Sequence, residues 1–253
     1  MYKALITDLD GTAVMISSDG SDVDGKTRHA VKQAQQRGFK LACATGREWR
    51  FARPVIDSLG FVSPCIIEGG TRIVEPATGK TLWEKYLDPD TPAAILDIFK
   101  REAESGLLMI SADDARPPLH TVNSVPEKLR YIYLLSVREQ VAIKIINSIN
   151  ASGSIIAHMT PSWDGDGLVD IHVTHVEATK EHAIQVWQEM ENIAKRETIG
   201  LGDSGNDLPI FQSAGLKVAV ENARPELKEL ADYIAPSVQE NGLAYVIDRF
   251  LMQ

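Results

Sequence analysis

The chain has 253 residues and a formal net charge of −9, with 44% hydrophobic and 24% charged residues. These values are ordinary for a globular protein with a real core, and the length suits one large domain or two modest ones. The negative charge argues against a nucleic-acid partner, and no stretch approaches the ~20 apolar residues of a membrane span. Cys43 and Cys65 lie in apolar, strand-like runs and read as buried thiols of a reducing compartment. The N-terminus starts directly with a strand pattern and no signal peptide, so we expect a cytoplasmic location.

Strand and helix patterns alternate in the first part of the chain. Strands are expected at 3–8, 39–44 and 64–67, and helices at 26–37 and 48–59. Both helical patterns stop at a glycine, which is a natural residue for a helix C-terminus. This βαβαβ order predicts a parallel sheet covered by helices.

The middle of the chain has more strands than helices. We expect helices at 91–104 and 138–150, and strands at 107–111, 130–136, 154–160 and 167–174. Stretches rich in Pro, Asp and Gly separate these elements. The pattern indicates a separate α+β unit, which we place at 84–176.

The last part of the chain resumes the first pattern. Its expected elements are helices at 179–194, 206–213, 225–231 and 241–252, and strands at 197–201 and 217–220. The simplest interpretation is an α/β core with a Rossmann-like, doubly wound parallel sheet, formed by 1–83 and 177–253. The α+β unit at 84–176 is then an insertion into that core.

The segment Asp8-Leu9-Asp10-Gly11-Thr12 follows the first expected strand and is the most informative stretch of the sequence. In an extended segment, the side chains of Asp8 and Asp10 point the same way. Two adjacent carboxylates repel each other unless a cation or a shared proton relieves them. The pair therefore fits a Mg²⁺ site, or a nucleophile with an adjacent acid/base, and a simple turn is the alternative.

Two other strand ends carry polar clusters, Thr45–Arg47 and Gly202–Asp207. Ligands of open α/β sheets bind beyond the carboxyl ends of the strands, so we expect these clusters to meet the first one. Asp8, Asp10 and Asp203 are then candidates for a single Mg²⁺ site with room for a phosphate oxygen.

Cationic and neutral donors for an anion are also present. Thr45 offers a hydroxyl, the backbone around Gly46 offers N–H groups, and Lys180 lies in the first turn of its expected helix, where it adds to the positive dipole end. The alternatives are a solvated surface lysine for Lys180, a helix N-cap for Thr45, and a turn with an N-cap for Asp203 and Asp207.

The ordered set of motifs closely resembles the haloacid dehalogenase superfamily of phosphotransferases, and within it the Cof-type branch of sugar-phosphatase-like hydrolases. The matching segments are Asp8–Thr12, Ala44–Arg47, Lys180, Gly202–Asp207, Glu221–Lys228, Ala231–Ile234 and Asn241-Gly242. The insertion matches the type-2 cap of this branch in position and size. The resemblance therefore implies a cap domain at 84–176.

The resemblance also implies a role for each matched residue. Asp8 would be the nucleophile, Asp10 the general acid/base, and Thr45 and Lys180 the groups that hold the phosphoryl oxygens. The implied Mg²⁺ ligands are Asp8, Asp10 through its backbone carbonyl, and Asp203, with Asp207 in support. The implied phosphate- or substrate-binding residues are Gly11, Thr12, Gly46, Arg47 and Asn206.

The resemblance implies a Mg²⁺-dependent phosphatase that hydrolyses a small phosphorylated metabolite, with sugar phosphates as the substrates of this branch. A phosphomutase-type phosphotransferase on the same site, and a non-catalytic binding protein that retains the fold, remain alternatives. We expect no nucleic-acid or membrane partner, and a monomer or small homo-oligomer. In the cap, Trp163, Asp164, Asp166 and His172 are candidates to contact the leaving group.

Some segments depart from the branch or imitate other motifs. Glu68-Gly69-Gly70 stands where relatives often have Asn-Gly-Ala, a departure that concerns substrate or cap contacts more than the chemistry. Glu181, which follows Lys180, either pairs with it or faces water. The acidic loop 14–24 has no assigned role.

Gly20–Thr27 fits the P-loop pattern, but the preceding strand has already ended, and the aspartates of this loop would repel a triphosphate. Gly200–Gly205 fits the dinucleotide-binding pattern, but it places Asp203 in the pyrophosphate turn.

Overall fold

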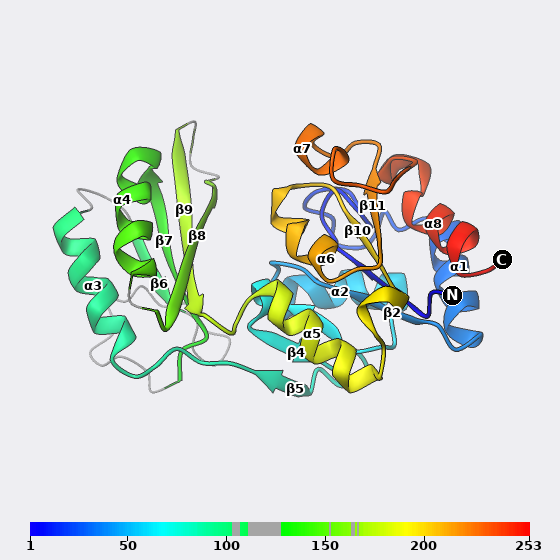
Figure 1. The fold of residues 1–253 in the computed structure, drawn as a ribbon, viewed down its shortest axis with the longest axis horizontal. Helices are drawn as coiled ribbons and strands as arrows, with labels where there is room; N and C mark the ends of the chain where they lie inside the picture. The colour runs from blue at the N-terminus through cyan, green and yellow to red at the C-terminus, as the bar shows by residue number, and fades with distance from the viewer. Residues whose placement is uncertain (103–106, 111–127, 152, 163–164, 166) are drawn as a thin grey trace. The chain divides into compact units, whose positions relative to one another are not determined.

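The computed structural model describes the chain except residues 103–106, 111–127, 152, 163–164 and 166 (Figure 1). The described residues form two compact units. The core unit consists of Met1–Trp83 and Lys180–Gln253, and the inserted unit of Glu84–Thr179. Trp163, Asp164 and Asp166, which we considered as substrate contacts, lie outside the described residues.

A five-stranded parallel sheet forms the centre of the core unit, in the order β12-β11-β10-β1-β2 (Figure 1). The strands are β1 Ala4–Thr7, β2 Lys40–Cys43, β10 Thr198–Gly202, β11 Leu216–Val220 and β12 Tyr233–Ala235. Every residue of β1 and β10 is buried, as expected for central parallel strands that are covered on both faces. The expected α/β class with a parallel sheet is confirmed.

Helices pack on this sheet in groups: α1 contacts α2 and α8, and α5 contacts α6. Their bounds are α1 Gly25–Gln36, α2 Trp49–Leu59, α5 Lys180–Glu191, α6 Leu208–Gln212, α7 Pro225–Lys228 and α8 Gly242–Phe250. The Asp24 carboxylate caps α1 by accepting the Lys26 N–H at 2.7 Å. The P-loop-like segment therefore ends in an ordinary helix start, well after β1 has finished at Thr7.

A small second sheet extends the edge of the core. It contains β3 Cys65–Ile67, β4 Arg72–Val74 and β5 Thr81–Glu84, and β3 pairs with β4 antiparallel. A parallel bridge between Ala44 and Ile66 joins it to the end of β2. The sequence patterns missed β4, β5 and β12, which are three or four residues long. Periodicity alone does not identify runs this short; β1 to β3 were identified by the alternation of strands and helices around them, and no α-helix separates β3, β4 and β5.

The inserted unit is a four-stranded antiparallel sheet in the order β6-β7-β9-β8, with α3 and α4 on one face (Figure 1). The elements are α3 Thr91–Glu102, β6 Leu107–Ile110, β7 Tyr131–Arg138, α4 Glu139–Asn150, β8 Ile155–Pro161 and β9 Leu168–His175. They bury a core of their own. His172 is buried and stacks on Tyr133 with a ring-centroid distance of 4.4 Å, so its expected contact with substrate stays a prediction.

None of the helices in the described part of the chain combines the length and apolar character needed to cross a bilayer.

Candidate active site

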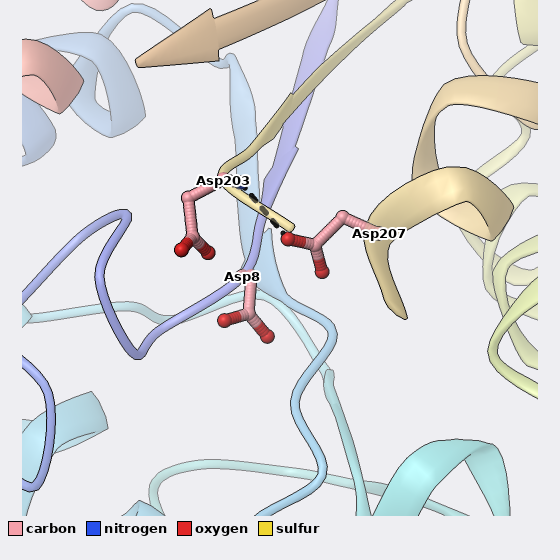
Figure 2. A group of neighbouring side chains, drawn as sticks. All are labelled: Asp8, Asp203 and Asp207. Carbon is pink, nitrogen blue, oxygen red and sulfur yellow. Dashed lines mark hydrogen bonds between the residues drawn. The ribbon is translucent and has the colours of Figure 1, made fainter. Parts of the chain in front are cut away.

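Three carboxylates converge where β1 and β10 end at the same edge of the sheet (Figure 2). Strands β1 and β10 are parallel neighbours, with Thr7 opposite Leu201, so the residues that follow them emerge together. Asp8 and Asp203 come from these two strand ends, and Asp207 comes from the 3₁₀ turn Gly205–Asp207 that follows β10. One oxygen of each carboxylate lies within 4.8 Å of the other two.

Lys180 lies between two of these carboxylates. It is the first residue of α5, and its Nζ donates to Asp8 Oδ1 at 3.2 Å and to Asp207 Oδ1 at 3.0 Å. The side chain is only 7% exposed, so the interpretation as a solvated surface lysine is wrong. Glu181 is exposed and faces water.

Asp207 organises the loop that follows β10. It is completely buried, and its Oδ2 accepts the backbone N–H groups of Asp203 at 3.0 Å and Ser204 at 3.2 Å (Figure 2 shows the first of these). Residue 202 has to be a glycine beside Asp207, because a Cβ atom at this position would lie 2.6 Å from the Asp207 Cβ. Both oxygens of Asp207 are therefore already used to fix Asp203 and Lys180.

The turn after β1 is fitted closely around Asp203. The Thr12 hydroxyl donates to Asp203 Oδ1 at 2.9 Å, and Gly11 has a φ of +75°, which a side chain would strain. A Cβ on Gly11 would also lie 2.7 Å from Asp203 Oδ2. The N–H groups of Gly11 and Thr12 donate within the turn, to Val14 O and Leu9 O. In this structure both residues thus shape the site through the turn and through Asp203.

Asp10 points its side chain at Arg47. Arg47 Nε donates to Asp10 Oδ2 at 2.7 Å and Nη2 donates to Oδ1 at 2.6 Å, which is a bidentate ion pair. The Ser17 N–H adds a third bond to Oδ1 at 2.9 Å. Because of this pair, the pKa of Arg47 is raised further above its ordinary value, against the opposing effect of partial burial.

Thr45 is buried at the end of β2. Its N–H donates to Ile66 O at 3.0 Å, and its Oγ1 accepts the Arg47 N–H at 3.1 Å. Helix α2 begins later, after Glu48, so Thr45 is not its N-cap. Gly46 and Asn206 are exposed, and Asn206 Oδ1 accepts from the Ser204 hydroxyl at 2.9 Å.

Two further residues, Asn222 and Glu68, support the site in ways that the sequence analysis did not predict. Asn222 follows β11 at the same edge of the sheet, and its Nδ2 donates to Gly11 O at 2.7 Å. Its position just beyond a strand end was the available signal. Glu68 was expected near substrate or cap contacts, but its carboxylate is buried and accepts from Arg72 Nη1 at 3.2 Å. Its N–H donates to Arg47 O at 2.9 Å, which supports the turn that carries Thr45.

The site has more negative charge than its lysine neutralises. Burial raises the pKa of Asp8 to about 8, and the charges of Asp207 and Asp203 add to this rise while Lys180 opposes it. Burial and Asp207 likewise raise the pKa of Asp203 to about 6. Burial lowers the pKa of Lys180, but Asp8 and Asp207 more than compensate, and the net pKa is above its ordinary value.

These observations fit a bound divalent cation. The donors are carboxylate oxygens, which Mg²⁺ prefers, and a second positive charge would relieve the repulsion that raises both pKa values. Asp8 and Asp203 have oxygens available to a cation, whereas Asp207 is held by Lys180 and two backbone N–H groups. The side chain of Asp10 is held by Arg47, which leaves its backbone carbonyl as the expected donor.

Comparison with known proteins agrees with this geometry. The sequence profile of the haloacid dehalogenase-like hydrolase family matches residues 5–247. The chain is 25% identical to the 5-amino-6-(5-phospho-D-ribitylamino)uracil phosphatase YwtE of Bacillus subtilis, over 98% of each chain. It is 25% identical to a phosphoglycolate phosphatase of Methanopyrus kandleri, over 99% of this chain and 98% of that one. A solved haloacid dehalogenase-like hydrolase from B. subtilis shares the fold with a TM-score of 0.80 at 19% identity, over 98% of this chain and all of the other. The expected family is confirmed, and the chain belongs to the haloacid dehalogenase-like hydrolases.

Proposed function

We propose that this protein is a Mg²⁺-dependent phosphatase that hydrolyses a small phosphorylated metabolite through an aspartyl-phosphate on Asp8. The observation that carries the proposal is the convergence of Asp8, Lys180 and Asp203 at one edge of the sheet. Phosphoryl transfer depends mainly on positioning and on neutralising charge, and this cluster offers a carboxylate next to a fixed cation. The phosphatase names of full-length relatives support the same reaction class.

Asp8 is suited to be the nucleophile because it is buried at the strand end and already faces Lys180 at 3.2 Å. Mg²⁺, when bound, supplies the positive charge that lets an ionised carboxylate approach a phosphate dianion. An oxygen of Asp8 attacks phosphorus, and the bond from phosphorus to the leaving oxygen breaks. Lys180 stays next to Asp8 and donates to the transferred phosphoryl oxygens.

Asp10 acts as the general acid and then as the general base in this proposal. It gives a proton to the leaving oxygen in the first step, and as a carboxylate it then takes a proton from water. That water attacks the phosphorus of the aspartyl-phosphate, which releases inorganic phosphate and frees Asp8. Thr45 holds a phosphoryl oxygen, because its Oγ1 already accepts from Arg47 N–H and its own hydrogen is left to donate.

The proposed substrate is a small phosphorylated metabolite, and more specifically a sugar phosphate. The relatives are named for different small phosphate esters, a ribitylaminouracil phosphate and phosphoglycolate, which supports a small phosphorylated metabolite for this chain. A sugar phosphate is the finer proposal. The inserted unit would act as the cap that selects the leaving group and excludes water. A cytoplasmic location and a monomer or small homo-oligomer remain predictions from the sequence.

Phosphate release tests the proposal. The native protein is incubated with sugar phosphates, phosphoglycolate and p-nitrophenyl phosphate, with Mg²⁺ or with a chelator, beside the variant Asp8→Asn. We expect release that requires Mg²⁺ and falls by at least about 1,000-fold in Asp8→Asn. The exposed Asp57 on α2 provides the matched control Asp57→Asn, which should keep native activity.

Other outcomes separate the alternatives. Release that persists in purified Asp8→Asn contradicts the nucleophile assignment. Transfer of the phosphoryl group to an alcohol, seen in the products, identifies a phosphomutase-type reaction. Absence of turnover across the panel favours a binding protein that retains the fold.

A further inference from the structure

Arg47 makes contacts that its expected role as a phosphate- or substrate-binding residue does not explain. We infer that Arg47 is a positioning residue, which holds the carboxyl group of Asp10 in a fixed plane and direction. Arg47, together with the backbone of Ser17 and Ser18 in the acidic loop, forms what we call the Asp10 clamp. This inference rests on the proposed function, since it assigns Arg47 a part in the proton transfer made by Asp10.

The hydrogen-bond donors of Arg47 are almost fully used by the chain itself. Nε and Nη2 donate to the two oxygens of Asp10, and Nη1 donates to Ser18 O at 2.6 Å and to Phe51 O at 3.2 Å. A guanidinium has five N–H groups in a planar fork, so these bonds occupy four of them. Arginine frequently binds phosphate through two parallel N–H groups, and here the Nε and Nη2 face is turned to Asp10 while Nη1 bonds to backbone carbonyls.

Asp10 keeps one position open for chemistry. A carboxylate offers about four acceptor positions, and the N–H groups of Arg47 and Ser17 fill three of them. Oδ1 accepts two of these bonds and Oδ2 accepts one, so the remaining position is on Oδ2. The clamp therefore selects which oxygen exchanges a proton with the leaving group.

The clamp is attached to the rest of the site through the backbone. The Arg47 N–H donates to Thr45 Oγ1 at 3.1 Å, and Arg47 O accepts the N–H of Glu68 at 2.9 Å. The same short turn thus sets the hydroxyl of Thr45 and the carboxyl of Asp10. This also gives the loop 14–24 a role, because its residues Ser17 and Ser18 contribute to the clamp from the other side.

The chemistry of the leaving group separates a positioning role from phosphate binding. An alkyl phosphate expels a strongly basic alkoxide and needs the proton of Asp10, whereas p-nitrophenyl phosphate expels a weakly basic phenolate and needs it far less. Loss of the clamp should therefore reduce hydrolysis of alkyl phosphates selectively. Loss of a residue that binds phosphate should instead weaken the binding of both substrates equally and raise both KM values.

The test compares kcat and KM for p-nitrophenyl phosphate and for the alkyl phosphate that the native protein hydrolyses fastest. The variants are Arg47→Met, Arg47→Lys, Asp10→Asn and the double variant, with Arg50→Met as the matched control. Arg50 is exposed, and its Nε pairs with Glu48 at 3.3 Å. Thermal unfolding checks that each variant is folded, and Arg47→Lys keeps the charge if Arg47→Met does not fold.

We expect Arg47→Met to lower kcat for the alkyl phosphate about 100-fold and kcat for the aryl phosphate less than about tenfold, with both KM values within about threefold of native. Asp10→Asn should show the same selectivity, and the double variant should add no further selectivity. Arg47→Lys should recover part of the alkyl activity, because an ammonium keeps the charge and loses the bidentate geometry.

The inference is overturned if Arg47→Met lowers both activities equally, raises both KM values and weakens inhibition by inorganic phosphate, which is the behaviour of a phosphate ligand. It is also overturned if the losses from Asp10→Asn and Arg47→Met multiply in the double variant. If the native protein hydrolyses neither substrate, the proposed function itself fails, and the two failures are thereby distinguished.

Discussion

Lys180 is the buried cation of the site, and its replacement by methionine gives a sharp test of the charge balance. When both carboxylates are ionised, the Lys180 charge at 3.2 Å from Asp8 and 3.0 Å from Asp207 corresponds to about 5 kcal/mol of attraction in each pair at an effective dielectric constant of about 20. Desolvation offsets much of this attraction. Removing one partner of a buried pair costs about 3–5 kcal/mol, which is the loss of unfolding free energy that we expect for Lys180→Met.

The unfolding free energy lost in Lys180→Met should depend on pH. The pKa of Asp8 is raised to about 8 in the metal-free protein, with burial as the main cause and Lys180 opposing it. Without Lys180 the pKa of Asp8 rises further. Above pH 8 the folded variant then retains a proton that both the unfolded chain and the native fold release, so its stability falls relative to native as pH rises. The loss of unfolding free energy for Lys180→Met is therefore expected to be larger at pH 9.5 than at pH 7.

Urea unfolding with a chelator at these two pH values measures the effect. Tryptophan fluorescence reports mainly on the core unit, which contains three of the four tryptophans, Trp49, Trp83 and Trp187. Lys32→Met, at an exposed position of α1, is the control and should change stability by less than about 0.5 kcal/mol. A loss for Lys180→Met below about 1 kcal/mol that is the same at both pH values would refute the reasoning.

Two further predictions concern the cation and the turn after β1. Because the pKa values of Asp8 and Asp203 are raised to about 8 and about 6, Mg²⁺ binding should release protons, and its Kd should rise as pH falls from 8 to 6. Calorimetry in two buffers of different ionisation enthalpy measures this release, and a Kd independent of pH contradicts it. Gly11→Ala should cost about 1–3 kcal/mol and weaken Mg²⁺ binding, because its φ is +75° and its Cβ would press on Asp203. Gly25→Ala, where a Cβ meets nothing within 4 Å, is the control for thermal unfolding and calorimetry; equal behaviour of the two variants argues against the prediction.

The sequence was sufficient wherever the pattern was long or the topology was strict. Strand β1 is a short, mostly apolar run, and β10 combines two apolar residues with glycine and Thr198; a polar cluster follows each strand. Both strands could therefore be predicted, and their parallel register then brings Asp8 and Asp203 to the same edge. Lys180 could be placed only at a helix start. Its burial between Asp8 and Asp207 depends on how α5 packs on the sheet, which no local pattern specifies.

Side-chain pairing was the part that sequence reasoning could not supply. Arg47 lies two positions after Thr45 in the chain, which suggested phosphate binding, but its partner Asp10 is 37 positions away. The carboxylate of Glu68 is likewise committed to Arg72, and Glu68 has a φ of +54° that propensities disfavour for a charged residue. Such choices are decided by loop conformation and by the burial of charge, after the sheet and helices are in place.

The site also joins two segments that lie far apart in the chain. Thr12 and Asp203 are hydrogen-bonded although 191 positions separate them, and β1 has β2 on one side and β10 on the other. During synthesis on the ribosome, β1 therefore leaves one apolar edge without its native neighbour until the whole inserted unit and α5 have emerged. Contacts between such distant segments form slowly. The nascent core is thus exposed to aggregation and to chaperones while these segments are synthesised. A chain that stops before β10 lacks Asp203 and Asp207, the carboxylates that lie beside Asp8.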